Sequence, residues 1–228
     1  GDDIMPRLPE LIDAGHALNN LDTGRPLTHI IDQVQSANAY IGAQPIIEAL
    51  KQNATVVITG RSTDTALTYA PMAFEFGWAP DDWDKFAIGV AAGHINECGA
   101  QASGGNSLIA WEQVPNMADI GYPIIEAYPD GSFVVTKHDG TGGLINRAVV
   151  TEQILYELGN PLDYITPDVV ADFTSMRIDD VGENRVKVHS VRGKPRTDKL
   201  KVSISYHAGY KAVGTLVYSW PDAVKKAE

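Results

Sequence analysis

The chain changes its hydrophobic pattern near its middle, and this change limits the folds open to it more than any other feature. Before residue 121, helical spacing alternates with extended runs such as ATVVIT at 54–59, which is apolar and β-branched like the strands of parallel sheets. After residue 169, apolar and polar residues alternate with period two, as at 185–191 and 200–206. The pattern predicts an α/β fold with a mainly parallel sheet and flanking helices in the first half, followed by an antiparallel β meander of α+β type.

Apolar spacing and helix-ending residues locate the expected elements. Helices are expected at 3–14, 43–52, 64–76, 81–101 and 146–158. Strands are expected at 30–38, 54–59, 123–127 and 132–137, the last two joined by a Pro-Asp-Gly turn. We expect residues 1–160 to form the α/β region and residues 161–228 a β-rich region packed on it, as two domains or one continuous domain.

The composition excludes several classes of protein. The 21 glycines have no period, 44% of the residues are hydrophobic, and there is one cysteine, which excludes collagenous, disordered and disulfide-stapled chains. No apolar run approaches the ~18 residues of a membrane span, and the acidic GDD start is unlike a signal peptide. We therefore expect a cytoplasmic protein without a membrane partner.

The charge is unevenly distributed along the chain. The net charge is −11, yet residues 181–228 hold ten basic and four acidic residues. Binding to a phosphate backbone would have to overcome repulsion from the acidic remainder, so nucleic acid is not an expected partner. The basic residues are expected either on the exposed face of a strand or beside a small anion.

A first candidate site follows the 54–59 run, where the chain reads GRSTD. Ligands of open α/β sheets bind at the carboxyl ends of strands, close to helix N-termini. Arg61 can clamp a carboxylate or phosphate there, with Asp64 orienting it, and the amide of Asn38 can position a substrate carbonyl. Alternatively, Asp64 or Thr63 caps the helix, Arg61 pairs with a surface acid, and Asn38 serves the local backbone.

A second candidate lies in the sequence GHINECGAQ. On a helix, His94, Glu97, Cys98 and Gln101 would share one face, because their spacings are three and four. His94 and Glu97 would then form a general acid/base pair, or two ligands of a metal that needs a third, and Gln101 would help to position a carbonyl. Alternatively, Cys98 fills a helix contact and His94 bonds Glu97. The sequence indicates no particular cofactor and no complete metal site.

A third candidate is the loop KHDGTGG after an expected strand. Its glycines can present N–H groups to an anion beside a lysine. The residues concerned are Lys137, Asp139, Gly140, Thr141, Gly142 and Gly143. It is neither a Walker A sequence nor a dinucleotide fingerprint, and a tight turn is the alternative.

Long and unusual strings occur along the whole chain. They are ANAYIGA at 37–43, VVITGRSTD at 56–64, EFGWAPDDWDK at 75–85, AGHINECGAQASGG at 92–105, IGYPIIE at 120–126, DGSFVVTKHDGTGG at 130–143 and TPDVVADF at 166–173. These strings resemble the acyclic terpene utilisation protein A family. The resemblance implies a bacterial, cytoplasmic protein that takes part in the breakdown of citronellol, geraniol and related isoprenoids as CoA thioesters. Family members are typically longer, so the chain resembles their central part, and a missing segment, a small partner subunit or a homo-oligomer is expected to complete it.

Two hypotheses follow for the function. The first is an enzyme that acts on a carboxylate or acyl-CoA intermediate, by hydration or another lyase-type proton transfer. Arg61 and residues 137–143 would hold the anion, His94 and Glu97 would exchange protons, and Asn38 and Gln101 would position the carbonyl. The second is a non-catalytic binding or assembly subunit of an acyl-CoA carboxylase pathway. The enzyme hypothesis requires these residues to surround one cavity.

Overall fold

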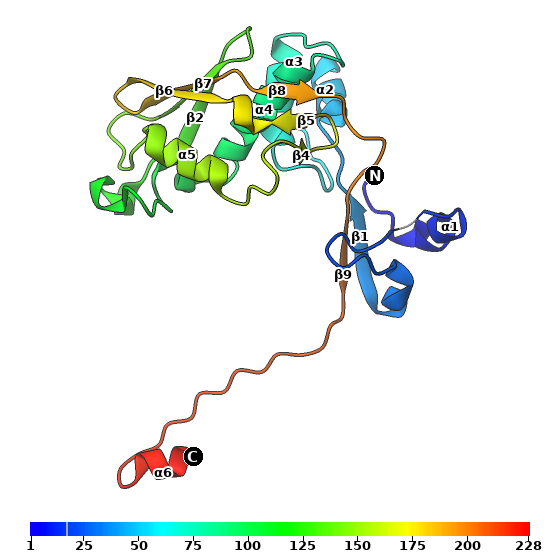
Figure 1. Ribbon diagram of the computed structural model, residues 1–228, viewed down its shortest axis with the longest axis vertical. Helices are drawn as coiled ribbons and strands as arrows, with labels where there is room; N and C mark the ends of the chain where they lie inside the picture. The colour runs from blue at the N-terminus through cyan, green and yellow to red at the C-terminus, as the bar shows by residue number, and fades with distance from the viewer. Residues whose placement is uncertain (17) are drawn as a thin grey trace.

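The computed structural model describes residues 1–16 and 18–228, which form a main body, a small lobe and a tail (Figure 1). The main body comprises residues 40–200. The small lobe comprises the described part of residues 1–39 together with residues 201–207. The tail, residues 208–228, runs away from both and ends in the short helix α6, Ala223–Ala227.

Helix α4, Trp83–Asn96, lies at the centre of the main body and is buried from Phe86 to Ile95. Its many Ala and Gly residues allow α3, Ala66–Glu75, to pack closely on it, and strands β5 and β8 cover another side. Helices α2, Gln44–Lys51, and α5, Arg147–Leu155, complete the helical layer. These helices confirm the helices that the spacing of apolar residues predicts.

Two antiparallel sheets complete the main body. The larger has the strand order β2-β3-β7-β6, from β2 Pro123–Ala127, β3 Phe133–Lys137, β7 Arg185–His189 and β6 Arg177–Gly182. The smaller has the order β4-β5-β8, from β4 Tyr164–Ile165, β5 Val170–Asp172 and β8 Arg192–Lys194. Alternate side chains of the larger sheet, such as Val186 and Val188, are buried in the main core, which explains the period of two.

The small lobe has its own core. Strand β1, Val34–Ala39, pairs antiparallel with β9, Val202–Tyr206, which comes from the far end of the sequence. Helix α1, Leu8–Asp13, follows a short 3-10 turn, Met5–Arg7, and further turns occupy Leu27–His29 and Ile31–Gln33. Leu8, Leu27 and Ala37 form a buried cluster separate from the main core.

The expected parallel sheet is not present in the described part of the chain, and this prediction was wrong. The sheets there are antiparallel, and residues 54–59 form no strand. A parallel contact remains only as isolated bridges, Ile41 to Ser62 and Ile120 to Gly142. Ile58 is 91% exposed, so the β-branched run has no neighbouring strands to bury it.

The long helix expected over 81–101 is shorter than predicted. α4 ends at Asn96, a 3-10 turn follows over Gly99–Ser103, and Gly99 has a φ of +56°, which a continuing helix does not allow. The hairpin β2–β3 and the helix near 146–158 are confirmed. The antiparallel strands after residue 169 also exist, but they are shared among three sheets rather than joined in one meander.

No helix in residues 1–16 and 18–228 combines the length and the apolar character needed to cross a bilayer.

Candidate functional site

A pocket of about 390 Å³ lies where the small lobe meets the main body, around Arg61. Three of the predicted site residues, Asn38, Arg61 and Asp64, line it. The complete lining is Asp2, Asn38, Thr59, Gly60, Arg61, Ser62, Asp64 and Leu67. The pocket therefore collects residues from the N-terminal segment, from β1 and from the turn that leads into α3.

Backbone pairing holds these segments together. The N–H of Thr63 donates to the carbonyl of Ile41 at 2.8 Å, as part of the bridge between Ile41 and Ser62. β1 precedes Ile41 directly and carries Asn38, so the bridge fixes the GRSTD turn beside β1. Although no parallel sheet forms, this single parallel contact still brings Arg61 near Asn38.

Asp2 occupies one wall of the pocket and ties its parts together. The amide of Asn38 donates to the carboxylate of Asp2 at 2.9 Å. The backbone N–H of Arg61, and then the Asn38 amide, lower the pKa of Asp2 by hydrogen bonds to its charged form. The close approach of the carboxylate requires glycine at position 60, because a Cβ there would overlap it. The amide of Asn38 thus serves the site as a support for Asp2.

Arg61 offers an exposed cation to the pocket. Its guanidinium carbon lies 5.4 Å from the ring centroid of Tyr40, and the ammonium of Lys201 lies 5.0 Å from the same centroid. In the part of the chain that the structure describes, neither Arg61 nor Lys201 forms an ion pair with a carboxylate. An incoming anion therefore finds two cations fixed near one aromatic ring.

Asp64 and Leu67 also line the pocket. Asp64 is exposed, and no side chain caps the start of α3 with a hydrogen bond, so the capping alternative for Asp64 and Thr63 is not observed. Leu67 is 63% exposed, and the neighbouring Val56 and Ile58 are also exposed. The pocket thus combines a charged end with an apolar border.

His94 lies in a different environment, inside the main body. It is only 8% exposed, and its Nε2 is 3.1 Å from the carbonyl oxygen of Ile154. Its Nδ1 lies 3.5 Å from the hydroxyl of Tyr164, whose ring packs edge-on against it. Burial lowers the pKa of His94, and the bond to Ile154 only partly offsets this effect. The imidazole is therefore neutral at pH 7 and engaged by protein groups.

Glu97 and Cys98 follow the end of α4 and do not form the predicted pair with His94. The carboxylate of Glu97 accepts a hydrogen bond of 2.9 Å from the Sγ of Cys98. Burial, followed by this bond, raises the pKa of Cys98 to about 11, so the residue is a thiol at neutral pH. Gln101 lies on the 3-10 turn beyond Gly99 and does not share the α4 face.

Three donors of the loop of residues 137–143 are already bonded to backbone carbonyls of the protein. The N–H groups of Gly142 and Gly143 donate to the carbonyls of Asp119 and Pro115, both at 2.8 Å. The ammonium of Lys137 donates to the carbonyl of Thr141 at 2.8 Å. Gly140 and Asp139 are exposed at the tip. The loop is a tight turn packed on its neighbours, as the alternative interpretation expected.

The structure therefore divides the predicted site residues into separate groups. Asn38, Arg61 and Asp64 share a pocket, while His94, Glu97, Gln101 and residues 137–143 are not among its lining residues. Tyr164 is one residue between the groups, because its hydroxyl lies 3.5 Å from the Nδ1 of His94, and the charge of Asp64, after burial, raises its pKa. The described residues contain no group of three His, Cys, Asp or Glu side chains arranged to hold a metal.

Sequence reasoning missed Asp2, which lines the pocket, and two residues beside Arg61, Tyr40 and Lys201. Asp2 and Lys201 are distant in sequence from Arg61, and no local pattern connects them to it. Tyr40 lies two positions after Asn38 in the ANAY string, yet its contact with Lys201 depends on how β9 pairs with β1.

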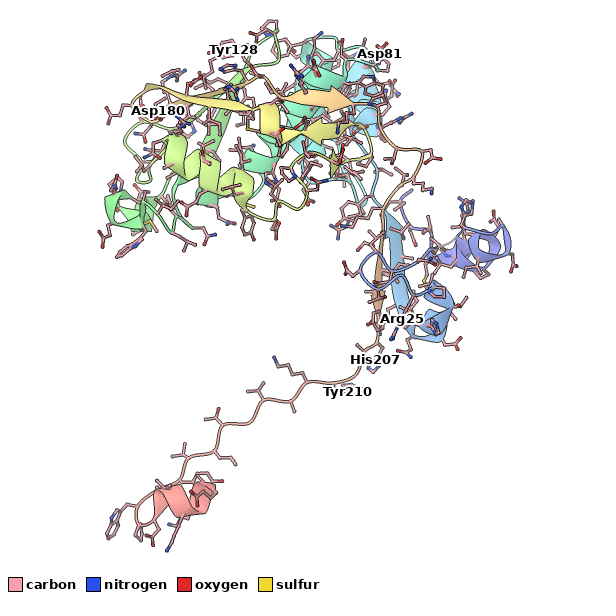
Figure 2. All side chains as sticks on the ribbon, viewed as in Figure 1. Arg25, Asp81, Tyr128, Asp180, His207 and Tyr210 are labelled. Atoms are coloured by element: carbon pink, nitrogen blue, oxygen red, sulfur yellow. The ribbon has the colours of Figure 1, made fainter. Side chains whose placement is uncertain are left out.

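A second groove, of about 460 Å³, lies on α5 and is lined by residues that include Arg147, Glu152 and Asp180. Figure 2 shows Asp180 on the main body, far from the small lobe. The carboxylate of Glu152 already accepts from the hydroxyl of Ser107 and the N–H of Leu108, both at 2.6 Å. The carboxylate of Asp180 likewise accepts from the backbone N–H of Arg147 at 2.8 Å. Both carboxylates of the groove therefore serve the fold, and the Arg61 pocket, which also joins three predicted site residues, is the stronger candidate.

Comparison with known proteins gives one match. The family model described as acyclic terpene utilisation family protein AtuA matches residues 1–228. No curated protein and no solved structure matches the chain significantly. The match spans the pocket, the main body and the tail, and it agrees with the strings found in the sequence. The chain belongs to the acyclic terpene utilisation AtuA family.

Proposed function

We propose that the chain binds a carboxylate or acyl-CoA intermediate of acyclic terpene breakdown in the Arg61 pocket. The observation that carries the proposal is the exposed guanidinium of Arg61, which lines a pocket and has no carboxylate partner among the described residues. The family match supports the terpene pathway, and the pocket supports the class of ligand.

The charged end of the pocket fits an anionic group. A guanidinium matches a carboxylate or phosphate with two parallel hydrogen bonds. Lys201, beside the same tyrosine ring, adds a second positive charge that suits the phosphates of a CoA ester. Asp2 and Asp64 are negative, so we expect them to meet the polar parts of the ligand while the anion binds on the Arg61 side.

The apolar border fits an isoprenoid chain. Leu67 lines the pocket, and Val56 and Ile58 stand exposed on the segment that enters it. Covering such side chains stabilises a complex by ~25 cal/mol for each Å² of apolar surface removed from water. A branched aliphatic acyl chain lying over these side chains would bury them.

The positions of His94 and Glu97 favour binding over catalysis by that pair. Both ring nitrogens of His94 face protein groups, and Glu97 faces Cys98. The hydratase or lyase reaction needs a proton donor and acceptor within reach of the bound ligand, roughly 2.6–3.2 Å. A binding or assembly role in an acyl-CoA pathway is the form of the proposal that these contacts support.

The direct test is titration calorimetry of the 228-residue chain with citronellate, with its CoA thioester and with CoA alone. We expect both citronellyl ligands to bind the wild type, and Arg61→Ala to weaken binding by roughly 10- to 100-fold, as for loss of a charge-assisted hydrogen-bonded pair. The matched control is Arg25→Ala, an exposed arginine on the small lobe (Figure 2).

Two results would contradict the proposal. One is the absence of binding to the wild type, and the other is equal loss of affinity in the Arg61 and Arg25 variants. Lys201→Gln distinguishes the two ligand types, because we expect this substitution to lower the affinity for the CoA thioester more than the affinity for the free carboxylate. Mass spectrometry of the same incubations, for a shift of one water or one carboxyl group, tests the enzyme hypothesis independently.

A further inference from the structure

The tail is an extended apolar segment that contacts little of its own chain. Between Gly209 and Tyr218 no residue belongs to a helix or strand, and none of the backbone-to-backbone hydrogen bonds of the described residues involves this stretch. Its large side chains are at least three-quarters exposed at Tyr210, Val213, Leu216 and Val217. Figure 1 shows the segment running away from the body.

The sequence of this segment is that of a β-strand. KAVGTLVY at 211–218 contains β-branched and aromatic residues and a single charge. A strand left alone exposes unpaired backbone groups as well as apolar side chains, and both are stabilised by pairing with a sheet edge. The segment therefore requires a partner with a free edge.

The same chain carries such an edge on β9. In β1, the carbonyl of Ala37 and the N–H of Ala39 bond to residues 2–4 at 2.9 and 2.8 Å, and so point away from β9. The residues opposite them are Ile204 and Val202. In an antiparallel pair, residues that do not bond each other direct their backbone groups outward. Val202 and Ile204 therefore present N–H and C=O groups to the outer edge of β9, where no described strand pairs.

The outer edge of β9 is complementary to residues 211–218 in apolar side chains and in charge. Val202 and Ile204 pack on the core of the small lobe, so a paired strand would extend an existing apolar face. The small lobe, residues 1–39 and 201–207, contains six acidic residues, two arginines and one lysine, whereas the added strand carries one lysine and no acid. Attraction between opposite charges thus favours the same pairing.

We infer that two copies of the chain exchange tails, so that residues 211–218 of each add a strand to the outer edge of β9 in the other. A second copy is the partner because the segment leads away from its own β9 instead of turning back along it. Each copy supplies both a strand and an edge, so a two-fold pair satisfies both and closes on itself. Residues 207–210 form the link between β9 and the exchanged strand (Figure 2).

The first experiment measures mass by sedimentation velocity over a range of concentrations. We expect the wild type to be a dimer, and Val213→Asp/Val217→Asp to raise the dimer dissociation constant by about 100-fold or more, because positions four apart share one face of a strand and each exchanged strand would bring two charges to that face. The control is Leu21→Asp/Leu108→Asp, which adds the same charges at side chains that are both 83% exposed. In one copy Val213 and Val217 are 83% and 91% exposed, so circular dichroism should show both variants folded.

The second experiment measures hydrogen exchange at the Ile204 amide. We expect slow exchange in the wild-type dimer and fast exchange in Thr215→Pro, which removes one backbone donor from the exchanged strand. A monomeric wild type would overturn the inference. Slow exchange at Ile204 in a monomer would show that each tail folds back on its own β9. Equal weakening of the dimer by the tail double substitution and by the control double substitution would also overturn the inference of tail exchange.

Discussion

Arg61 and His94 differ in what surrounds their charge, and this difference decides what each residue can do. Arg61 is exposed in a pocket and has no carboxylate partner among the described residues, so its charge is available to a ligand. His94 is surrounded by Ile154, Tyr164 and Phe173, which keep it neutral and supply its contacts. The first is suited to binding, and the second to holding α4 against α5 and β4.

Burial of His94 predicts a loss of stability in acid. Because its pKa is lowered in the folded state, the unfolded chain binds the extra proton first as the pH falls below the ordinary value of 6.5. The free energy of unfolding should then fall by at most about 1.4 kcal/mol per pH unit from this residue, until the folded pKa is passed. Urea unfolding at pH 7.5 and pH 5.5 measures this change in the free energy of unfolding. The change between the two pH values should be smaller for His94→Gln than for the wild type.

The thiol of Cys98 should react slowly. A pKa of about 11, against an ordinary value of 9.0, reduces the thiolate about 100-fold at neutral pH. Alkylation by iodoacetamide at pH 7.5 should therefore be at least ~10-fold slower in the folded protein than in urea, since the thiolate is the reactive form. Glu97→Gln should speed the reaction of the folded protein, and fast alkylation of the wild type would exclude the hydrogen bond to Glu97.

At the scale of elements, the contact between α3 and α4 depends on the absence of a side chain at Gly93. A Cβ at this position would lie 2.5 Å from the carbonyl oxygen of Thr65, at the start of α3. Gly93→Ala gains up to ~1 kcal/mol of helix propensity but overpacks the contact by about 1–3 kcal/mol, so the net effect is a loss of stability. The midpoint of thermal unfolding measures this loss of stability. As a control, Gly159→Ala should change the midpoint little, because a Cβ there has open space. A Gly93→Ala variant more stable than the wild type would contradict the close packing of α3 on α4.

Asp168, in the turn before β5, bonds to α3 and to the start of α2. Its carboxylate accepts from the hydroxyl of Tyr69 on α3 and from the N–H of Ala43 at 2.8 Å, just before α2. Burial, and then the charge of Asp168, raise the pKa of Tyr69 well above its usual value. The hydroxyl is therefore a donor at every ordinary pH.

Removing Asp168 should leave two donors without an acceptor. We expect Asp168→Ala to cost about 2–4 kcal/mol and Tyr69→Phe about 1–2 kcal/mol in unfolding free energy. The double variant should cost less than the sum, because the two side chains share one hydrogen bond. Additive losses in urea unfolding would show that the bond does not connect α3 to this loop.

At the scale of the whole molecule, the two separate cores predict two unfolding transitions. Leu8 is 1% exposed in the small-lobe cluster, so Leu8→Ala should destabilise that lobe by about 2–5 kcal/mol. The four tryptophans lie at positions 78, 83, 111 and 220, outside the small lobe. Tryptophan fluorescence should then report an almost unchanged transition, while hydrogen exchange in β1 becomes faster. A matching shift in both signals would show that the chain unfolds as one unit.

The helices and the β2–β3 hairpin were predictable because their signals are local. The spacing of apolar residues in α4 and the Pro-Asp-Gly turn act over a few residues. The parallel sheet failed for the opposite reason. The run at 54–59 has strand propensity, but a buried strand also needs neighbours, and near this run the structure supplies a single parallel bridge, from Ile41 to Ser62. Arg61 and Asp64 of the first candidate site were found because GRSTD follows that run, whether or not the run forms a strand.

The sequence alone determined the helices, the alternating strands, the family strings and the choice of Arg61 as a candidate ligand-binding residue. The tertiary structure decided which of these meet, since contacts between distant segments depend on sheet pairing that no local pattern encodes. Pairing of β1 with β9 brings Lys201 to Tyr40 and Arg61, whereas packing of α4 buries His94 away from them. Local propensity acts within a few residues, and burial is a property of the assembled core.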